Sequence, residues 1–144
     1  MNKIPKENPY LAKSGLLKGT NLKEIGKKAM AEFREIERRT KRKAYIKSAY
    51  FNKQKVFFDY FWDHLNQKRK RERKTRLKLF NVAIEVIKNS KNPPVSVDNP
   101  ANRNETLHRF IGVTKNGKLF CVQIKEDKKK GNKYFMSAFW VKNK

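Results

Sequence analysis

The chain has 144 residues and a formal net charge of +24, because 37 residues are Lys or Arg and only 13 are Asp or Glu. With 38% hydrophobic residues it is long enough for one domain with its own core, and the charge excess predicts a polyanionic partner, nucleic acid above all. We expect no membrane contact and a cytoplasmic location, because the sequence has neither a run of about twenty apolar residues nor the apolar segment of a signal peptide.

The first half of the chain is predicted to be basic and largely helical. Residues 1–20 are expected to form a flexible basic arm, because prolines and glycines interrupt a polar sequence. Residues 21–74 follow as a basic helical extension. Its first helix begins after Asn21, a typical N-cap residue, and apolar residues recur at helical spacing to Ile36, with room to continue to Ala49.

Three potential metal ligands, Asp59, Asp63 and His64, lie about one helical turn apart in an aromatic-rich segment. Three such residues on one helix, with no further donor, are more typical of a helix surface than of a metal site. The single cysteine, Cys121, excludes an internal disulfide and a cysteine-based zinc site. We therefore expect no metal and no other cofactor.

A dense positive run leads into the next predicted helix. The size of the net charge favours contacts of this run with phosphate groups over a merely solvated helix face. The helix that follows carries an apolar stripe from Leu77 to Ile87, which needs a partner surface, and it ends before Pro93 and Pro94. The residues of the run that we expect to bind nucleic acid are Lys68, Arg69, Lys70, Arg71, Arg73 and Lys74.

The last third of the chain changes to β-branched and aromatic residues. Strands are predicted over 106–114, 119–126 and 133–141, and turn residues between them indicate an antiparallel meander. A fourth strand is marked less clearly around Val95–Val97. The helical stripe is the obvious cover for the apolar face of this sheet, so we expect an α+β fold.

The turn at Asn116–Gly117 decides which residues the first two strands bring together. A two-residue type I′ loop there places His108 opposite Lys125. A three-residue loop that begins at Lys115 instead shifts the register by one and sets His108 beside Ile124. We favour the two-residue loop, because it sorts five apolar side chains onto one face: Ile111, Val113, Phe120, Val122 and Ile124.

The second hairpin extends the polar face of the sheet. A three-residue loop that ends at Gly131, with this glycine in the left-handed conformation, places Gln123 opposite Ser137 and Lys125 opposite Phe135. The predicted polar face therefore gathers His108, Gln123, Lys125 and Ser137.

This face has the residue types that cleave RNA through its own 2′-hydroxyl, a reaction that needs a base, an acid and cations beside the phosphate. His108 could be base or acid, Lys125 could stabilise the phosphate charge, and Ser137 could hold a phosphate oxygen. A lone strand histidine is more often structural, and that alternative stays open. Further candidates for contacts with nucleic acid or phosphate are Arg103, Arg109, Gln123 and Lys133.

Residues 75–142 resemble the PBECR nuclease domains of the superfamily that groups barnase, EndoU, colicin-type tRNases and RelE. The segments that carry the resemblance are Leu77–Ile87, Thr106–Gly112 and Lys133–Phe139, together with Lys125. The resemblance implies helices packed on a curved antiparallel sheet of three to four strands, a BECR-like fold, over a nuclease domain of residues 75–144. One departure is that Trp140 and Val141 stand where a proline is expected.

The roles that this resemblance implies agree with the polar face. His108 would be the acid or base, Lys125 and Arg109 would contact phosphate, and Ser137 would be the polar residue of the last strand. The implied activity is that of a metal-independent endoribonuclease, a toxin or effector of a phage or mobile element. RNA, with tRNA as one candidate, is the expected partner, beside an acidic antitoxin or immunity protein. The alternative is a non-catalytic basic protein that binds RNA or DNA.

Overall fold

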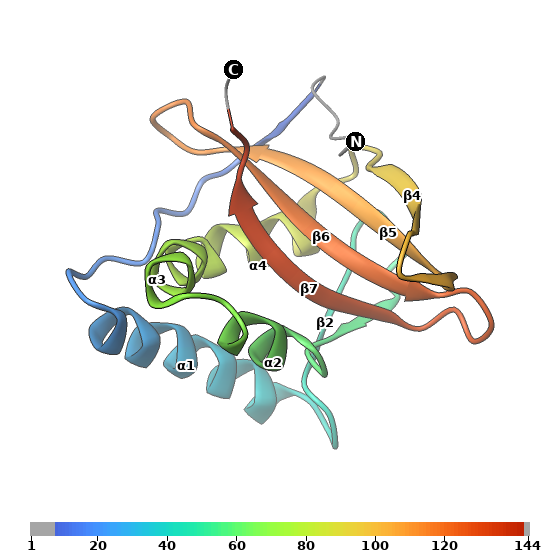
Figure 1. The fold of residues 1–144 in the computed structure, drawn as a ribbon, viewed down its shortest axis with the longest axis horizontal. Coiled ribbons are helices and arrows are strands. Elements are labelled where there is room, and N and C mark those ends of the chain that lie inside the picture. Colours follow the sequence, from blue (N-terminus) through green and yellow to red (C-terminus); the bar gives the residue numbers. More distant parts are fainter. Residues whose placement is uncertain (1–7, 143–144) are drawn as a thin grey trace.

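In the computed structural model, which describes residues 8–142, helices alternate with short strands in the first half of the chain and long strands fill the second half (Figure 1). Over these residues the architecture is mixed α+β, with one curled sheet of seven strands. The elements are β1 (Tyr10–Leu11), α1 (Leu22–Arg39), β2 (Tyr45–Lys47), β3 (Lys55–Phe57), α2 (Phe61–Asn66), α3 (Lys70–Lys78), α4 (Phe80–Asn89), β4 (Val95–Asn99), β5 (Asn102–Val113), β6 (Leu119–Asp127) and β7 (Lys133–Trp140).

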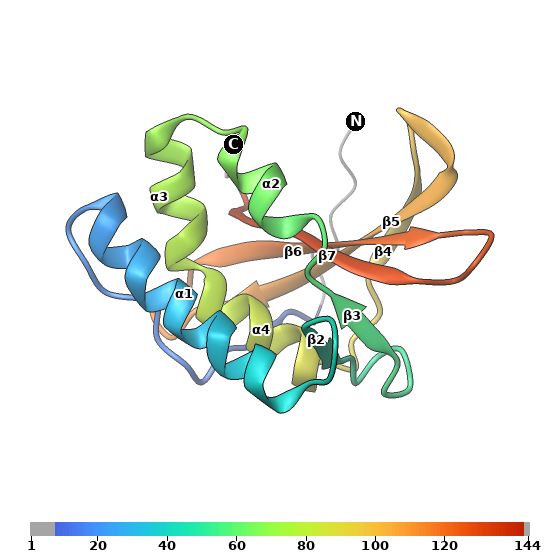
Figure 2. The same cartoon turned by 90° about the horizontal axis from the view of Figure 1, so that it is seen from below.

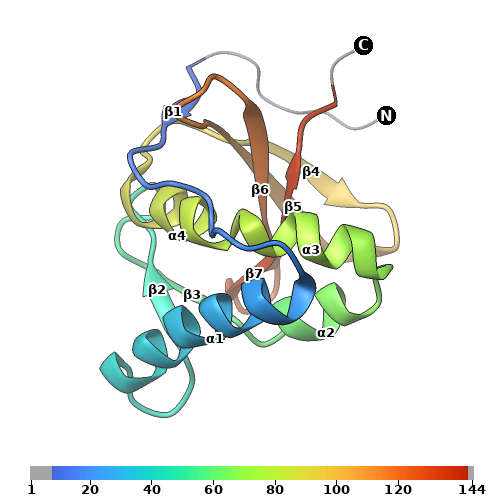
Figure 3. The same ribbon diagram turned by 90° about the vertical axis from the view of Figure 1, so that its left-hand side faces the viewer.

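The C-terminal antiparallel meander is confirmed, and the sheet is larger than the sequence predicts. Strands β4, β5, β6 and β7 pair in antiparallel fashion, and β4 contains the fourth strand expected around Val95–Val97. The structure adds two parallel pairs, β1 with β5 and β3 with β7, and β2 continues the sheet beyond β3. The long strands curve beside the helices (Figure 3).

The first helix begins where predicted and ends sooner. The Asn21 side chain accepts a hydrogen bond from the Glu24 N–H at 2.9 Å, as an N-cap does. The helix ends at Arg39, and the expected continuation to Ala49 is wrong, because Tyr45–Lys47 forms β2 and pairs with β3. None of the helices within residues 8–142 has the length and apolar character that a bilayer span requires.

The apolar stripe from Leu77 to Ile87 covers the sheet as expected, although it is divided between two helices. α3 and α4 meet at Leu79, and Leu77, Phe80 and Ile87 are all buried. The core also includes Val56, Phe61 and Phe135, so it draws on both sides of position 75. The predicted helical extension and the predicted nuclease segment therefore form one folded unit.

The N-terminal segment packs on this unit from Asn8 onward, so a loose arm does not describe its structured part. β1 pairs with β5, and Ala12 and Leu17 are buried. The Glu85 carboxylate accepts hydrogen bonds from the Tyr10 hydroxyl at 2.7 Å and from two backbone N–H groups, those of Lys13 and Ser14, at 2.8 Å each. Burial, followed by Glu85, raises the pKa of Tyr10 to about 12. Residues 1–7 of the expected arm lie outside the described residues.

The predicted two-residue loop of the first hairpin is wrong, and the three-residue alternative forms. The Thr114 N–H donates to the Lys118 carbonyl at 2.9 Å, and Gly117 takes the left-handed conformation with φ 86°. The Thr114 hydroxyl also accepts from the Lys118 N–H at 3.1 Å, which fixes the start of the loop. As a result His108 pairs with Ile124, not with Lys125.

The second hairpin keeps most of its predicted register. Gln123 lies opposite Ser137, as expected, and Gly131 has φ 74°. A register shift between Gln123 and Ile124 then places Lys125 opposite Tyr134, so the predicted pairing with Phe135 is wrong.

The observed register depends on a close approach at Gly112. A Cβ atom at this position would lie 2.4 Å from Cζ of Phe120, whose ring is fully buried and has no room to move. We therefore expect Gly112→Ala to lower the free energy of unfolding by about 1–3 kcal/mol, measured by urea denaturation.

Gly26 in α1 is the matched control for this prediction, because a Cβ atom there would meet nothing within 4 Å. Gly26→Ala is expected to raise stability by about 0.5–1 kcal/mol, as alanine favours a helix. Equal stability of the Gly112→Ala and wild-type proteins would contradict the packing described for Phe120.

Candidate functional site

The shift of one residue in the first hairpin separates His108 from the other predicted site residues. Successive side chains of a strand point to opposite faces of the sheet. His108 therefore shares the core face with Ile124, whereas Arg109, Gln123 and Ser137 form a row across β5, β6 and β7 on the other face. Lys125 lies two residues from Gln123 and belongs to that same face.

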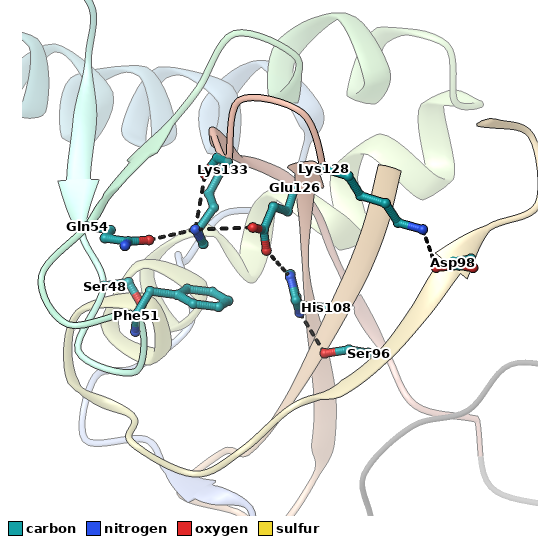
Figure 4. A network of polar contacts seen from close by, with 10 residues as sticks. Ser48, Phe51, Gln54, Ser96, Asp98, His108, Glu126, Lys128 and Lys133 are labelled. Carbon is teal, nitrogen blue, oxygen red and sulfur yellow. Dashed lines mark hydrogen bonds and ion pairs between the residues drawn. The ribbon is translucent and has the colours of Figure 1, made fainter. Parts of the chain in front are cut away.

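His108 is held in a closed network on the core face (Figure 4). One ring nitrogen, Nδ1, lies 2.6 Å from the Ser96 hydroxyl, and the other, Nε2, lies 2.7 Å from a Glu126 carboxylate oxygen. The residue is 8% exposed and packs against the Phe51 ring. Because both ring nitrogens are occupied, His108 links β4, β5 and β6 and has no nitrogen left for a substrate.

Lys133, expected to contact nucleic acid, belongs to the same network (Figure 4). Its ammonium group donates to the Gln54 side chain at 2.6 Å and to the Gly131 carbonyl at 3.1 Å, and it lies 3.6 Å from Glu126. The residue is 5% exposed. These contacts make Lys133 a structural residue rather than a surface cation.

On the opposite face, Arg76 of α3 reaches Ser137, a contact that sequence reasoning missed. Its guanidinium donates to the Ser137 hydroxyl at 2.5 Å and lies over the Phe139 ring, 5.5 Å from the ring centroid. In the same row, Arg109 Nε donates to the Gln123 side-chain oxygen at 3.0 Å. This face of the sheet therefore carries two guanidinium groups, that of Arg76 from α3 and that of Arg109 from β5.

Lys125 lies on this face between aromatic rings. Its ammonium group is 3.8 Å from the Tyr60 ring centroid and 5.9 Å from that of Tyr134, and it pairs with Glu105 at 3.2 Å. A cation over a ring face is attracted by the ring quadrupole. Tyr60 is also the N-cap of α2, so Lys125 lies against the start of that helix.

His64 of α2 is a further titratable group in the field of these cations. The cations also pair with carboxylates, Arg76 with Glu72 at 3.2 Å and Lys125 with Glu105 at 3.2 Å. Its backbone N–H donates to the Tyr60 carbonyl at 2.9 Å, which places it one helical turn beyond the residue that covers Lys125. Burial, followed by the positive charges of Lys68, Arg76 and Lys125, holds the pKa of His64 below its ordinary value of 6.5. Both causes favour the neutral form of the imidazole.

Helix α2 packs against the sheet through Phe61. Phe61, one turn before His64 in α2, stacks on Phe135 of β7 with 4.5 Å between ring centroids. Figure 2 shows β6 and β7 nearly edge-on, with α4 on one side and α2 on the other. The sequence pattern suggested a role for His64 only as a metal ligand beside Asp59 and Asp63. Asp59 instead pairs with Lys43 at 2.8 Å.

The basic run leads directly into Arg76. Arg69, Lys70 and Arg71 are exposed at the start of α3, while Lys68 is partly buried near His64. Arg73 and Lys74 are partly buried, and Nε of Arg73 has no hydrogen-bond partner within residues 8–142. Arg103, also expected to bind nucleic acid, is exposed near the start of β5.

Cys121 is an ordinary residue of β6, and its side chain lies on the same face of the sheet as that of Arg109. Burial raises the pKa of this thiol to about 12, and the positive charge of Arg109 opposes the rise only in part. The thiol therefore stays protonated and unreactive at neutral pH.

Searches of protein-family models, curated proteins and solved structures find no match for this chain.

Proposed function

We propose that the protein is an endoribonuclease that cleaves RNA by attack of the 2′-hydroxyl, with His64, Arg76 and Lys125 around the reacting phosphate. The observation that carries this proposal is the pair of cations held on one face of the sheet. Arg76 bonds to Ser137, and the Lys125 ammonium lies 3.8 Å from the centroid of the Tyr60 ring, one helical turn before His64. A neutral imidazole can accept the proton of the 2′-hydroxyl, and neighbouring cations can stabilise negative charge on the phosphate.

The chemistry follows from the positions of the three groups. His64 takes the proton from the 2′-hydroxyl, the 2′-oxygen forms a bond to phosphorus, and the bond from phosphorus to the 5′-oxygen breaks. The departing 5′-oxygen takes up a proton from water. Arg76 and Lys125 stabilise the negative charge that builds on the phosphate oxygens, because they are already held in place by Ser137 and Tyr60.

Other predicted residues support this site in secondary roles. Arg109 holds Gln123 and supplies further positive charge beside the Ser137 row. The exposed cations Arg69, Lys70 and Arg71 are suited to guide the RNA backbone towards Arg76. These assignments keep the roles that the PBECR resemblance implies for Lys125, Arg109 and Ser137, within a BECR-like fold, and transfer the role of His108 to His64.

An activity of this kind makes the protein a candidate toxin or effector. An acidic antitoxin or immunity protein would then inhibit it by covering the same cations, because complementary charge promotes fast and specific association.

The test compares labelled RNA with DNA of the same sequence in the presence of a chelator. We expect cleavage of the RNA to products that end in a cyclic 2′,3′-phosphate, and no cleavage of the DNA, which lacks the attacking hydroxyl. Binding of both without any product would support a non-catalytic nucleic-acid-binding protein. Equal cleavage of DNA would rule out the 2′-hydroxyl mechanism.

A further inference from the structure

A concave groove of about 590 Å³ lies between the end of α1, strand β2 and the end of α4. The buried side chains of Ile36 and Ile46 contribute to its lining. Of the residues that the structure describes, no Asp or Glu lines the groove, whereas four exposed cations do. These are Arg39, Lys47, Lys53 and Lys88.

Three of these cations lack an ionic partner. Lys47, Lys53 and Lys88 make no ion pair with any residue between positions 8 and 142. The carboxylate nearest to Arg39 belongs to Glu35 on its own helix, at 3.5 Å. Like charges gathered in a concavity repel one another and create a positive potential that an anion would neutralise.

Helix dipoles explain only part of this cluster. Cations are favoured at helix C-termini, and Arg39 and Lys88 lie in the last turns of α1 and α4. Lys47 belongs to a strand and Lys53 to the loop between β2 and β3, so neither position follows from a helix dipole.

The backbone of Lys53 adds an independent observation. Lys53 has φ 68° and follows Asn52 with φ 54°, so two successive residues take the left-handed conformation. Asn tolerates this conformation, but a long side chain such as Lys is uncommon there, and Gly is preferred. The loop therefore holds a cation at the groove in a conformation that its side chain disfavours, a feature associated with functional positions.

We propose that this groove binds the phosphodiester backbone of a nucleic acid, as a second contact region apart from the cleavage site. The inference takes its ligand class from the proposed function. The groove shares no residue with the cluster of His64, Arg76 and Lys125. In Figure 2, β2 and α4 lie on the side of β6 and β7 opposite to α2, so the groove is a separate region of the molecule.

The experiment measures binding of a labelled single-stranded DNA, which the proposed mechanism does not cleave, by fluorescence anisotropy over a range of salt concentrations. The groove variant carries Lys47→Gln, Lys53→Gln and Lys88→Gln. A control of equal charge carries Lys115→Gln, Lys129→Gln and Lys130→Gln, three exposed lysines at the hairpin turns. We expect the groove variant to bind about tenfold more weakly than the control at 0.1 M salt. The slope of log affinity against log salt should be smaller in magnitude by about 2 for the groove variant than for the control.

A single substitution separates a loss of DNA binding caused by lost charge from one caused by lost stability. Lys53→Asn removes one charge and suits the positive φ, so it should raise the melting temperature while it weakens DNA binding. Binding as strong as that of the wild type would contradict the proposal.

Two further outcomes would overturn the groove assignment. Equal losses in the groove variant and the control would show that only the total charge matters. Loss of tripolyphosphate binding in the groove variant, with DNA affinity unchanged, would show a site for small anions instead. Failure of the wild type to cleave RNA would refute the proposed nuclease activity alone, because the DNA measurement does not depend on cleavage.

Discussion

Replacement of His64 by alanine is expected to lower the rate of RNA cleavage by about 10²–10⁴-fold, the usual contribution of a general base. Burial and the positive charges of Lys68, Arg76 and Lys125 lower the pKa of His64 and so favour the neutral imidazole, the form that accepts a proton. The measurement is the single-turnover rate at saturating enzyme, so that weaker RNA binding does not enter.

His108→Ala is the matched control, because it removes the second histidine of the chain. His108 bonds to Ser96 and Glu126 through its two ring nitrogens, so its loss removes a hydrogen bond from the partly buried Glu126 carboxylate, which keeps the ion pair with Lys133 at 3.6 Å. We expect this variant to be less stable by about 1–3 kcal/mol and to cleave RNA within about tenfold of the wild-type rate while it stays folded. Loss of cleavage in folded His108→Ala, with activity kept in His64→Ala, would return the catalytic role to His108.

The contrast between the two histidines shows what the sequence could predict. Alternation along each strand placed Gln123, Lys125 and Ser137 on one face, and the structure has them there. The side chain of His108 was assigned to the wrong face because one loop is longer by one residue. Asn116–Gly117 is typical of a two-residue turn, but the hydrogen bonds of Thr114 with Lys118 favour the longer loop.

The contribution of the helices could not be found from local patterns. Arg76 and Ser137 are 61 residues apart in the chain, and they meet because α3 packs beside β7. The helix that carries His64, α2, lies against β7 for a similar reason, through the stack of Phe61 on Phe135. In the sequence His64 follows the aromatic Trp62 and the acidic Asp63, and none of its near neighbours marks it as a base beside phosphate. The parallel pairing of β3 with β7, which positions α2, has no short-range signal such as a hairpin turn.

Replacement of Arg76 by alanine is the second change with a large expected effect, a fall of about 10²–10³-fold in kcat, the usual cost of removing one preorganised donor to the reacting group. Arg76→Lys should restore little of the activity. An ammonium group cannot reproduce the planar fork that bonds to Ser137 and stacks over Phe139.

The pH dependence of kcat tests whether Arg76 acts on His64. With His64 as base, kcat rises with pH through the pKa of His64, which lies below 6.5. The Arg76 cation disfavours the protonated imidazole, so its removal raises that pKa and moves the rising limb to higher pH. Arg103→Ala removes an equal charge from an exposed position and should leave the limb in place. An unmoved limb in Arg76→Ala would contradict the assignment of His64 as the base whose titration Arg76 influences.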